Sequence, residues 1–388
     1  MPEGLALPRF DMAGETVTPL DLKPLLVGSG VRYPAAVYEA AAGRARLEPP
    51  DNPYAANCFL LPGEVAVHLA PNDRSPFSLE AGGDGSIALC CVGSRVTEVS
   101  FPAPSDYGAQ RTSSGTPFGG IAVLEGRGIL AFFYLWGCQF VRTREVCAFC
   151  HQAQAEAAGL PFPSPTGDEV AEVIRWSLDH AGIREVQMTG GTLSAPSEEC
   201  ARYARLLRTI DQRVGLDAIP GEVCCYMSAP KDPAATDPVF EAGADRIVHD
   251  LQTWDAGLRA RFSPGHSRVV DRPTQLRALE HIAARHGPNR ACSTFVVGLE
   301  PLDSLLEGAA YLAERGIVPS YSILMPPAGL ASQLHPNDLA YHRRATAEYA
   351  RLYKTCDLTP PGLAGGAHVC MCHDIYRFMD DVLESASC

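Results

Sequence analysis

The sequence predicts an α/β protein whose main part is a partial (β/α)6, TIM-like barrel, with a β-leaning N-terminal appendage and a C-terminal tail. Two observations lead to this prediction. From residue 128 onward, short apolar runs alternate with amphipathic stretches of about ten to fifteen residues, which is typical of parallel βα units. Residues 1–122 are instead rich in Gly, Pro and Ser, with only short strand-like pieces. We therefore expect an appendage at 1–122, a core at 123–335 and a tail at 336–388.

The expected elements follow one another in order. The core strands are the apolar runs at 129–136, 185–190, 222–228, 246–252, 292–298 and 318–324. The helices are the amphipathic stretches at 168–180, 197–214, 237–242, 274–286, 303–315 and 337–353, and the appendage has strands near 64–69 and 86–92. We expect Asp168 and Ser197 to cap helix N-termini. The helix ends are expected at Gly182, Gly287 and Gly316.

Charge and hydropathy argue against two kinds of partner. The net charge is −13 and no run of Lys or Arg occurs, whereas nucleic-acid phosphates attract clustered basic side chains. The N-terminus lacks a basic segment followed by an apolar one, so no secretion signal is expected. The apolar run at 129–136 is less than half of the roughly 20 residues that span a membrane. We therefore expect a cytoplasmic protein with no nucleic-acid and no membrane partner.

The chain contains 14 cysteines, and in a reducing cytosol clustered cysteines indicate metal or redox chemistry rather than a disulfide framework. Some of them sit among apolar or small residues and are expected only to pack as small hydrophobic side chains. These are Cys58, Cys90, Cys91, Cys200, Cys224, Cys225 and Cys292. The others lie at 137–150 and near the C-terminus.

The segment GCQFVRTREVCAFC at 137–150 places Cys138, Cys147 and Cys150 at gaps of eight and two. A structural zinc site usually has four ligands in two paired knuckles, and only one CxxC is present here. His151 directly follows Cys150, so its use as a fourth ligand would strain the loop. Three thiolates suit a 4Fe-4S cluster that leaves one iron open to another ligand. Unrelated buried thiols are the alternative interpretation.

Four segments together resemble the radical S-adenosylmethionine (SAM) superfamily. They are the cysteine loop after the first core strand, MTGGT at 188–192, FVVGLE at 295–300 and SILMPPAG at 322–329. The commonest family spacing of the cysteines is three and two, so eight and two departs from it. The resemblance implies that Gly190, Gly191 and Thr192 bind the amino group of SAM, with Thr192 where an acid usually stands. It also implies cofactor contacts for Phe149, Val297 and Met325.

The segment at 246–265 resembles the fourth-strand region of biotin-synthase-like members of this superfamily. By that resemblance, Asp250 or Gln252 holds the ribose of SAM, and Arg259 or Arg261 pairs with its carboxylate. An equally weighted alternative is a solvated helix start with surface arginines. Ser228, after the third strand, is a weaker candidate for the ribose.

The resemblance implies that a 4Fe-4S cluster on Cys138, Cys147 and Cys150 binds SAM and cleaves it with one electron. The resulting 5′-deoxyadenosyl radical would remove a hydrogen atom from a small-molecule biosynthetic intermediate. A reductant such as flavodoxin or ferredoxin would supply the electron. One alternative is a peptide-modifying radical SAM maturase, in which residues 1–122 capture a leader segment. The other is a non-catalytic Fe–S or zinc binding module.

The tail contains a second group of soft ligands in GGAHVCMCHD at 365–374. Cys370 and Cys372 with His368 and His373 could hold another metal, with Cys356 or Cys388 as further ligands. A Cys-x-Cys pair supplies too few thiols for an ordinary four-cysteine cluster. We therefore expect the tail to plug the barrel and the reconstituted protein to hold about four irons.

Overall fold

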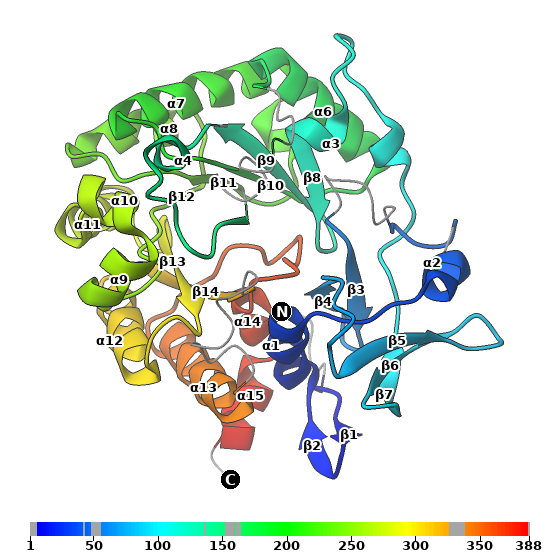
Figure 1. The fold of residues 1–388 in the computed structure, drawn as a ribbon. Helices are drawn as coiled ribbons and strands as arrows, with labels where there is room; N and C mark the ends of the chain where they lie inside the picture. Colours follow the sequence, from blue (N-terminus) through cyan, green and yellow to red (C-terminus); the bar gives the residue numbers. More distant parts are fainter. Residues whose placement is uncertain are drawn as a thin grey trace.

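A computed structural model of the protein describes residues 6–41, 43–47, 56–135, 137–151, 159, 164–325 and 338–386. Within these residues the main sheet has seven strands, in the order β14-β13-β12-β11-β10-β9-β8. They are β8 (Ala122–Glu125), β9 (Ile129–Leu135), β10 (Glu185–Gly190), β11 (Val223–Tyr226), β12 (Arg246–Val248), β13 (Ala291–Val297) and β14 (Val318–Ile323). Strands β9 to β14 are parallel, and the sheet curls into a half-barrel (Figure 1). The predicted fold class is therefore confirmed.

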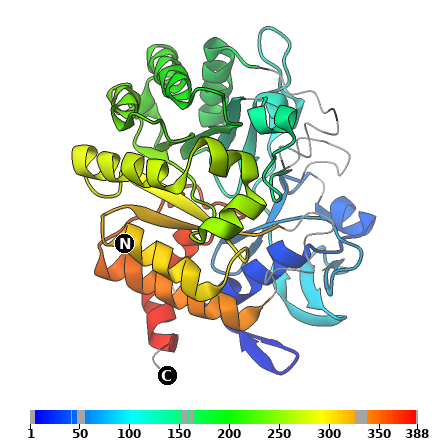
Figure 2. The same ribbon diagram turned by 60° about the vertical axis from the view of Figure 1, so that its left-hand side comes forward.

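Helices cover the outer face of this sheet (Figure 2). They are α6 (Gly167–His180), α7 (Pro196–Arg213), α8 (Asp237–Glu241), α11 (Arg272–His286), α12 (Leu302–Ala313) and α13 (Leu339–Thr355). Three shorter helices lie in the segments that follow β9 and β12: α4 (Gln139–Thr143), α9 (Ala256–Phe262) and α10 (Pro264–Val269). Apolar side chains at alternate strand positions pack beneath the helices of the outer face. Val186, Met188 and Cys225, for example, are 0% exposed. This burial explains why the strands read as nearly continuous apolar runs.

The predicted N-caps are wrong, whereas two of the predicted helix ends are confirmed. Thr166, not Asp168, caps α6 in a capping box, and α7 begins after Ala195 without a side-chain cap. Asp168 lies inside the first turn of α6, and Ser197 lies inside the first turn of α7. Gly182 (φ 60°) and Gly287 (φ 98°) end their helices in conformations that favour glycine. Gly316 follows Ala313, the last residue of α12, by three positions.

The N-terminal region combines small sheets with helices. Its elements are β1 (Phe10–Met12), β2 (Glu15–Val17), α1 (Pro19–Ser29), α2 (Ala35–Ala41), β3 (Cys58–Leu61), β4 (Val65–His68), β5 (Phe77–Ala81), β6 (Ile87–Cys91), β7 (Ser94–Val99) and α3 (Phe118–Ile121). Strands β4 and β6 confirm the two predicted strands. The buried helix α1 was not predicted, so this region is less purely β than the sequence indicated.

The tail fills the opening between the two edges of the half-barrel (Figure 1). On one side, Cys370 bridges to Ser322 of β14, and the Met371 N–H donates to the Tyr321 carbonyl (2.8 Å). On the other side, the Gly126 N–H after β8 donates to Nδ1 of His368 (3.1 Å). The helices α14 (Cys372–Arg377) and α15 (Met379–Ala386) follow. Closure of the barrel therefore comes from the end of the chain rather than from a further strand of the core.

In the part of the chain that the structure describes, no helix is both long and apolar enough to cross a membrane.

Candidate functional site

The three-cysteine loop leaves the carboxyl end of β9 and is anchored on α9 and α10. The Ala148 N–H donates to the Phe262 carbonyl (2.8 Å), and the Gly265 N–H donates to the Glu145 carbonyl (3.1 Å). A Cβ atom on Gly265 would lie 2.7 Å from the same carbonyl oxygen, so only glycine allows this approach. In barrels of this type, sites lie at the carboxyl ends of the strands, where this loop stands.

Two glycines at the end of β10 press against the start of the loop. A Cβ atom on Gly191 would lie 2.6 Å from the Cα and N atoms of Cys138, and one on Gly190 would lie 2.5 Å from the Leu135 carbonyl oxygen. The Gly191 N–H donates to that same carbonyl (2.5 Å). Any side chain here would therefore push the first cysteine out of place. Glycine is therefore required at both positions for the ends of β9 and β10 to approach this closely, whether or not the two residues also bind a ligand.

The three thiols are half-buried at this edge of the sheet. Burial, with a smaller contribution from the charges of Cys150 and Cys138, raises the pKa of Cys147 to about 12. Among the described residues, no group of three or more His, Cys, Asp or Glu side chains is arranged to hold a metal ion.

Thr192 is held from two sides by neighbouring strand ends. Its hydroxyl oxygen accepts a hydrogen bond from the Ser228 hydroxyl (3.1 Å), so the structure brings together these two predicted residues from β10 and β11. The carboxylate of Glu199 on α7 accepts from the N–H groups of Leu193 (2.6 Å) and Ser228 (2.8 Å). Glu199 is fully buried, and burial raises its pKa to about 7. Sequence analysis missed Glu199, although an acid on the apolar face of an amphipathic helix was a visible signal.

Asp250 and Gln252 follow β12 and differ in what they contact. The Asp250 carboxylate accepts from the Thr294 N–H (3.1 Å), and burial raises its pKa. The backbone of Gln252 is in the left-handed conformation (φ 70°). Its side-chain oxygen accepts a hydrogen bond from the Ser263 hydroxyl (2.5 Å). Ser263 and Gln252 also hydrogen-bond to Cys147 and oppose the rise of its pKa. Gln252 thus adjoins the cysteine loop, whereas Asp250 lies deeper in the barrel.

The two arginine candidates have different surroundings. Arg259 is 2% exposed, and its guanidinium is used within the protein. Its hydrogen-bond partners are Leu251, His266, Ser267, Val270 and Gln275. Arg261 is exposed, and its guanidinium lies over the ring of Phe262 (5.0 Å from the centroid). The two candidates therefore differ in burial, since Arg259 is buried and Arg261 is exposed.

Phe149 packs in a small cluster at the rim, with Phe262, Leu299 and Leu324 and beside Val296. Val297, the predicted contact, is fully buried in the main core, so only its backbone is available to a cofactor. Met325 is half-buried, and its carbonyl lies 3.3 Å from Nε2 of His151, next to the last cysteine. The prolines and glycine that follow, at 326–329, lie outside the described residues.

The inner face of the half-barrel is polar and partly open. Along the strands, residues that point away from the helices are half-buried while their neighbours are buried. These half-buried residues are Gln187, Thr189, Tyr226, Asp250, Thr294 and Ser322. Hydroxyl, amide and carboxyl groups therefore line the interior beneath the cysteine loop.

The soft ligands of the tail only partly come together. The sulfur atoms of Cys370 and Cys372 lie 2.7 Å apart, and His373 is buried beside them. His368 is instead stacked on His68 (4.8 Å between ring centroids). Cys356 ends α13, and Cys388 lies outside the described residues. In the described part of the chain these side chains form no group that could hold a metal ion.

Comparison with known proteins places this site in a family. Residues 137–325 match the model of the radical SAM superfamily. The range begins one residue before Cys138 and ends at Met325, so it contains the cysteine loop, the glycine pair and strands β10 to β14.

Similar proteins include enzymes of several activities. Bacteriochlorophyllide c C-7(1)-hydroxylase from Chlorobaculum limnaeum is 23% identical over 259 residues, which are 63% of this chain and 64% of that protein. Methylornithine synthase is similar in structure (TM-score 0.43, 18% identity, 65% of this chain and 72% of that one). So is coproporphyrinogen III oxidase from Escherichia coli (TM-score 0.33, 15% identity, 67% and 51%). Residues 137–325 therefore form a radical SAM superfamily domain.

Proposed function

We propose that the protein binds a 4Fe-4S cluster on Cys138, Cys147 and Cys150, and uses SAM to remove a hydrogen atom from a small molecule. The observation that carries this proposal is the packing of Gly191 against Cys138, at the carboxyl edge of a radical SAM domain. This contact joins the segment that would hold the cluster to the segment that would hold SAM. When bound, the reduced cluster supplies the electron that cleaves the sulfonium bond of SAM.

The chain's own residues would position SAM. Backbone carbonyls at Gly190 and Gly191 and the hydroxyl of Thr192 are acceptors for its amino group. The exposed guanidinium of Arg261 suits its carboxylate. Gln252 and Ser228 are hydrogen-bonding groups for the ribose. Phe149, with the backbone of Val297 and Met325, offers an apolar rim for the adenine.

Two observations support a small molecule over a peptide as the substrate. The inner face of the half-barrel is lined by polar side chains, and the tail fills the opening between its edges. A related hydroxylase also acts on a small molecule, a bacteriochlorophyllide. We therefore place the substrate on the inner face, next to Asp250 and Thr294. An external reductant of the flavodoxin or ferredoxin kind would be its electron source.

The test is anaerobic reconstitution of the full chain with iron and sulfide, followed by SAM and a chemical reductant. We expect about four irons per chain, absorbance near roughly 400 nm, and formation of 5′-deoxyadenosine. Cys138→Ala, Cys147→Ala and Cys150→Ala should each lose the absorbance and most of the iron. Cys91→Ala is the matched control, since Cys91 is a half-buried thiol on β6. Full iron content in all three loop variants would overturn the cluster assignment.

A further inference from the structure

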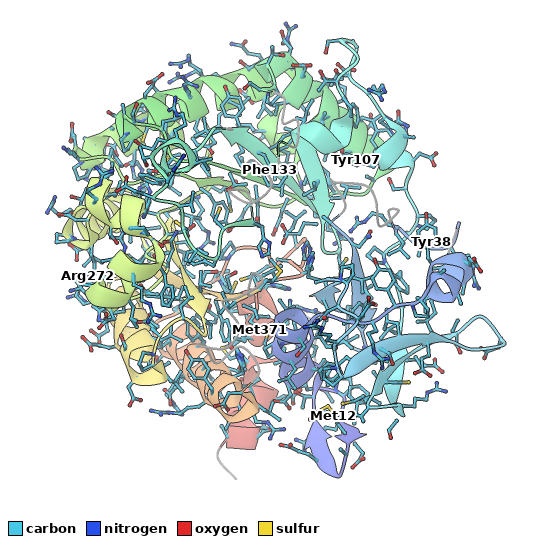
Figure 3. The ribbon with its side chains drawn as sticks, viewed as in Figure 1. Met12, Tyr38, Tyr107, Phe133, Arg272 and Met371 are labelled. Carbon is cyan, nitrogen blue, oxygen red and sulfur yellow. The ribbon has the colours of Figure 1, made fainter. Side chains whose placement is uncertain are left out.

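Two thiols of the tail lie together where the tail closes the barrel. Cys370 and Cys372 have their sulfur atoms 2.7 Å apart, and the Ser320 hydroxyl of β14 lies 3.3 Å from the first and 3.5 Å from the second. Backbone bonds fix the segment, because the Met371 N–H donates to Tyr321 and the Ile323 N–H to Val369. Cys370 therefore stands on a segment paired with β14, and Cys372 begins α14; Figure 3 labels Met371, which lies between them.

The two thiols differ in access. Cys370 is half-buried and packs against Ile129 and Ala131, on the opposite side of the barrel from β14. Its charge contributes to the raised pKa of Asp250, which places it on the same inner face. Cys372 is fully buried. A reagent inside the barrel would therefore meet Cys370 first and Cys372 only through it.

A buried polar chain lies behind this pair. His373 is fully buried beside the two thiols. Its Nε2 lies 3.1 Å from the carboxylate of Asp374, which accepts a hydrogen bond from Lys23 of α1 (2.7 Å). Burial of the ionisable side chains of His373, Asp374 and Lys23 costs free energy. Apolar side chains could fill the same space without that cost.

Charge and hydrogen bonding make the two thiols chemically unequal. The Cys372 thiol donates a hydrogen bond that lowers the pKa of Cys370, and His373 lowers it further. Burial, together with the neighbouring Cys370, raises the pKa of Cys372. The carboxylate of Asp374 raises the pKa of His373 against the opposing effect of burial. A thiolate is the nucleophile in thiol–disulfide exchange, so Cys370 is the attacking sulfur and Cys372 holds its proton until the second step.

We propose that Cys370 and Cys372 form a redox-active dithiol that opens onto the interior of the barrel and reacts with low-molecular-weight disulfides. The Cys370 sulfur attacks one sulfur of the small disulfide, forms a mixed disulfide and releases one thiolate. Cys372 then attacks the Cys370 sulfur, forms the Cys370–Cys372 bond and releases the second thiolate. The dithiol loses two electrons, the small disulfide gains them, and the two thiol hydrogens end on the released thiols. This chemistry goes beyond the proposed SAM reaction and does not depend on it.

The test uses the full chain without cluster or SAM, treated with bis(2-hydroxyethyl) disulfide, then alkylated and mapped by mass spectrometry. In the wild type we expect an internal Cys370–Cys372 disulfide. Cys372→Ala should instead retain a hydroxyethyl mixed disulfide on Cys370, and Cys370→Ala should leave Cys372 unmodified. Cys356→Ala, which removes a half-buried thiol outside the barrel, should behave as the wild type.

A second measurement uses only the wild type, so it does not depend on how the variants fold. At pH 7, iodoacetamide should modify Cys370 at least about tenfold faster than Cys224 or Cys292, because burial raises the pKa of both of those thiols. Equal labelling rates, or equal reactivity of the two single variants toward the small disulfide, would overturn the proposal. Failure of the SAM reaction alone would leave both results unchanged, so the two proposals can fail separately.

Discussion

Glu199 is a single buried carboxylate that ties together the ends of β10 and β11. One of its oxygens accepts from Leu193 and the other from Ser228, so it fixes the backbone on both sides of Thr192. The residue where the family usually has an acid is a threonine here, and an acid from the next helix supports the same loop. The site is thus organised by a carboxylate that stands seven positions away in sequence.

The substitution Glu199→Gln tests this role. An amide has one acceptor oxygen, so one buried N–H would face an NH2 group, at a cost of about 1–3 kcal/mol in the free energy of unfolding. The pKa of about 7 lies above the unfolded value, so the folded state binds the extra proton between about pH 4.5 and 7. The stability that Glu199 contributes is therefore present at low pH and is lost as the pH rises through 7. Urea unfolding at several pH values should show the difference between wild type and variant narrowing over this range; a constant difference contradicts the argument.

The glycine pair gives a second test at this scale. Gly191→Ala would bring a methyl group within 2.6 Å of the Cys138 backbone, so the first cysteine must move. We expect the variant to retain less than half of the reconstituted iron, measured on the purified protein. Gly83→Ala is the matched control, because a Cβ atom there meets nothing within 4 Å. Normal iron retention by Gly191→Ala would show that the contact can relax.

The location of single residues could be predicted from the sequence where those residues belong to a short local motif. The three cysteines and Gly190–Thr192 stand in short motifs, and the structure brings them to one edge of the sheet. Arg259 could not be separated from Arg261 in this way, because the difference lies in burial and in partners that are distant in sequence. Val297 was chosen by analogy to a motif, but the strand turns its side chain into the core.

At the scale of elements, the six parallel strands were predictable because their sequences are largely apolar runs that alternate with amphipathic helices. Strand β8 was missed, since four residues at a turn carry too little pattern. The pairing of the tail with β14 was also missed. Nothing in the sequence around Cys370 reads as a strand, and only the closed barrel supplies its partner.

Helix α1 and the tail are joined by a buried ion pair. Lys23 donates to Asp374 (2.7 Å) and to the carbonyls of Ala367 (2.8 Å) and Cys370 (2.7 Å), and both charged side chains are 0% exposed. Lys23→Met would leave Asp374 buried without its cation, which should cost about 3–5 kcal/mol in urea unfolding. Lys354→Met, which breaks an exposed pair with Asp380, should cost no more than about 1 kcal/mol. Similar losses for both variants would contradict the structural importance of the buried pair.

For the whole molecule, the N-terminal region, the barrel and the tail are bound together at several places. Glu169 of α6 accepts hydrogen bonds from Ser114 and Thr116, and the Leu7 N–H donates to Asp381 of α15 (2.7 Å). Figures 1 and 2 both show the β1–β2 hairpin and α15 at the same end of the molecule. We therefore expect residues 1–122 to unfold together with the rest of the chain, although the sequence composition changes at residue 122.

A shortened chain of residues 123–388 tests this unity. Without Lys23 and the rest of α1, the tail loses its buried partner and the core loses part of its apolar cover. We expect the full chain to unfold in one transition, seen alike by far-ultraviolet circular dichroism and tryptophan fluorescence. The fragment should lack a cooperative transition. A fragment that unfolds cooperatively at the same urea concentration as the full chain would show that residues 1–122 are a separate unit.

The closing segment also sets an order of events during synthesis. Strand β14 ends at Ile323, and the residues that seal the barrel, Val369 to Met371, are translated 46 to 48 positions later. At roughly 5–20 residues per second, the sheet is complete about 2–10 s before its interior can be sealed. During that interval the tail does not yet cover the inner face on the nascent chain. A bulky inorganic group could then be loaded without reopening a finished protein.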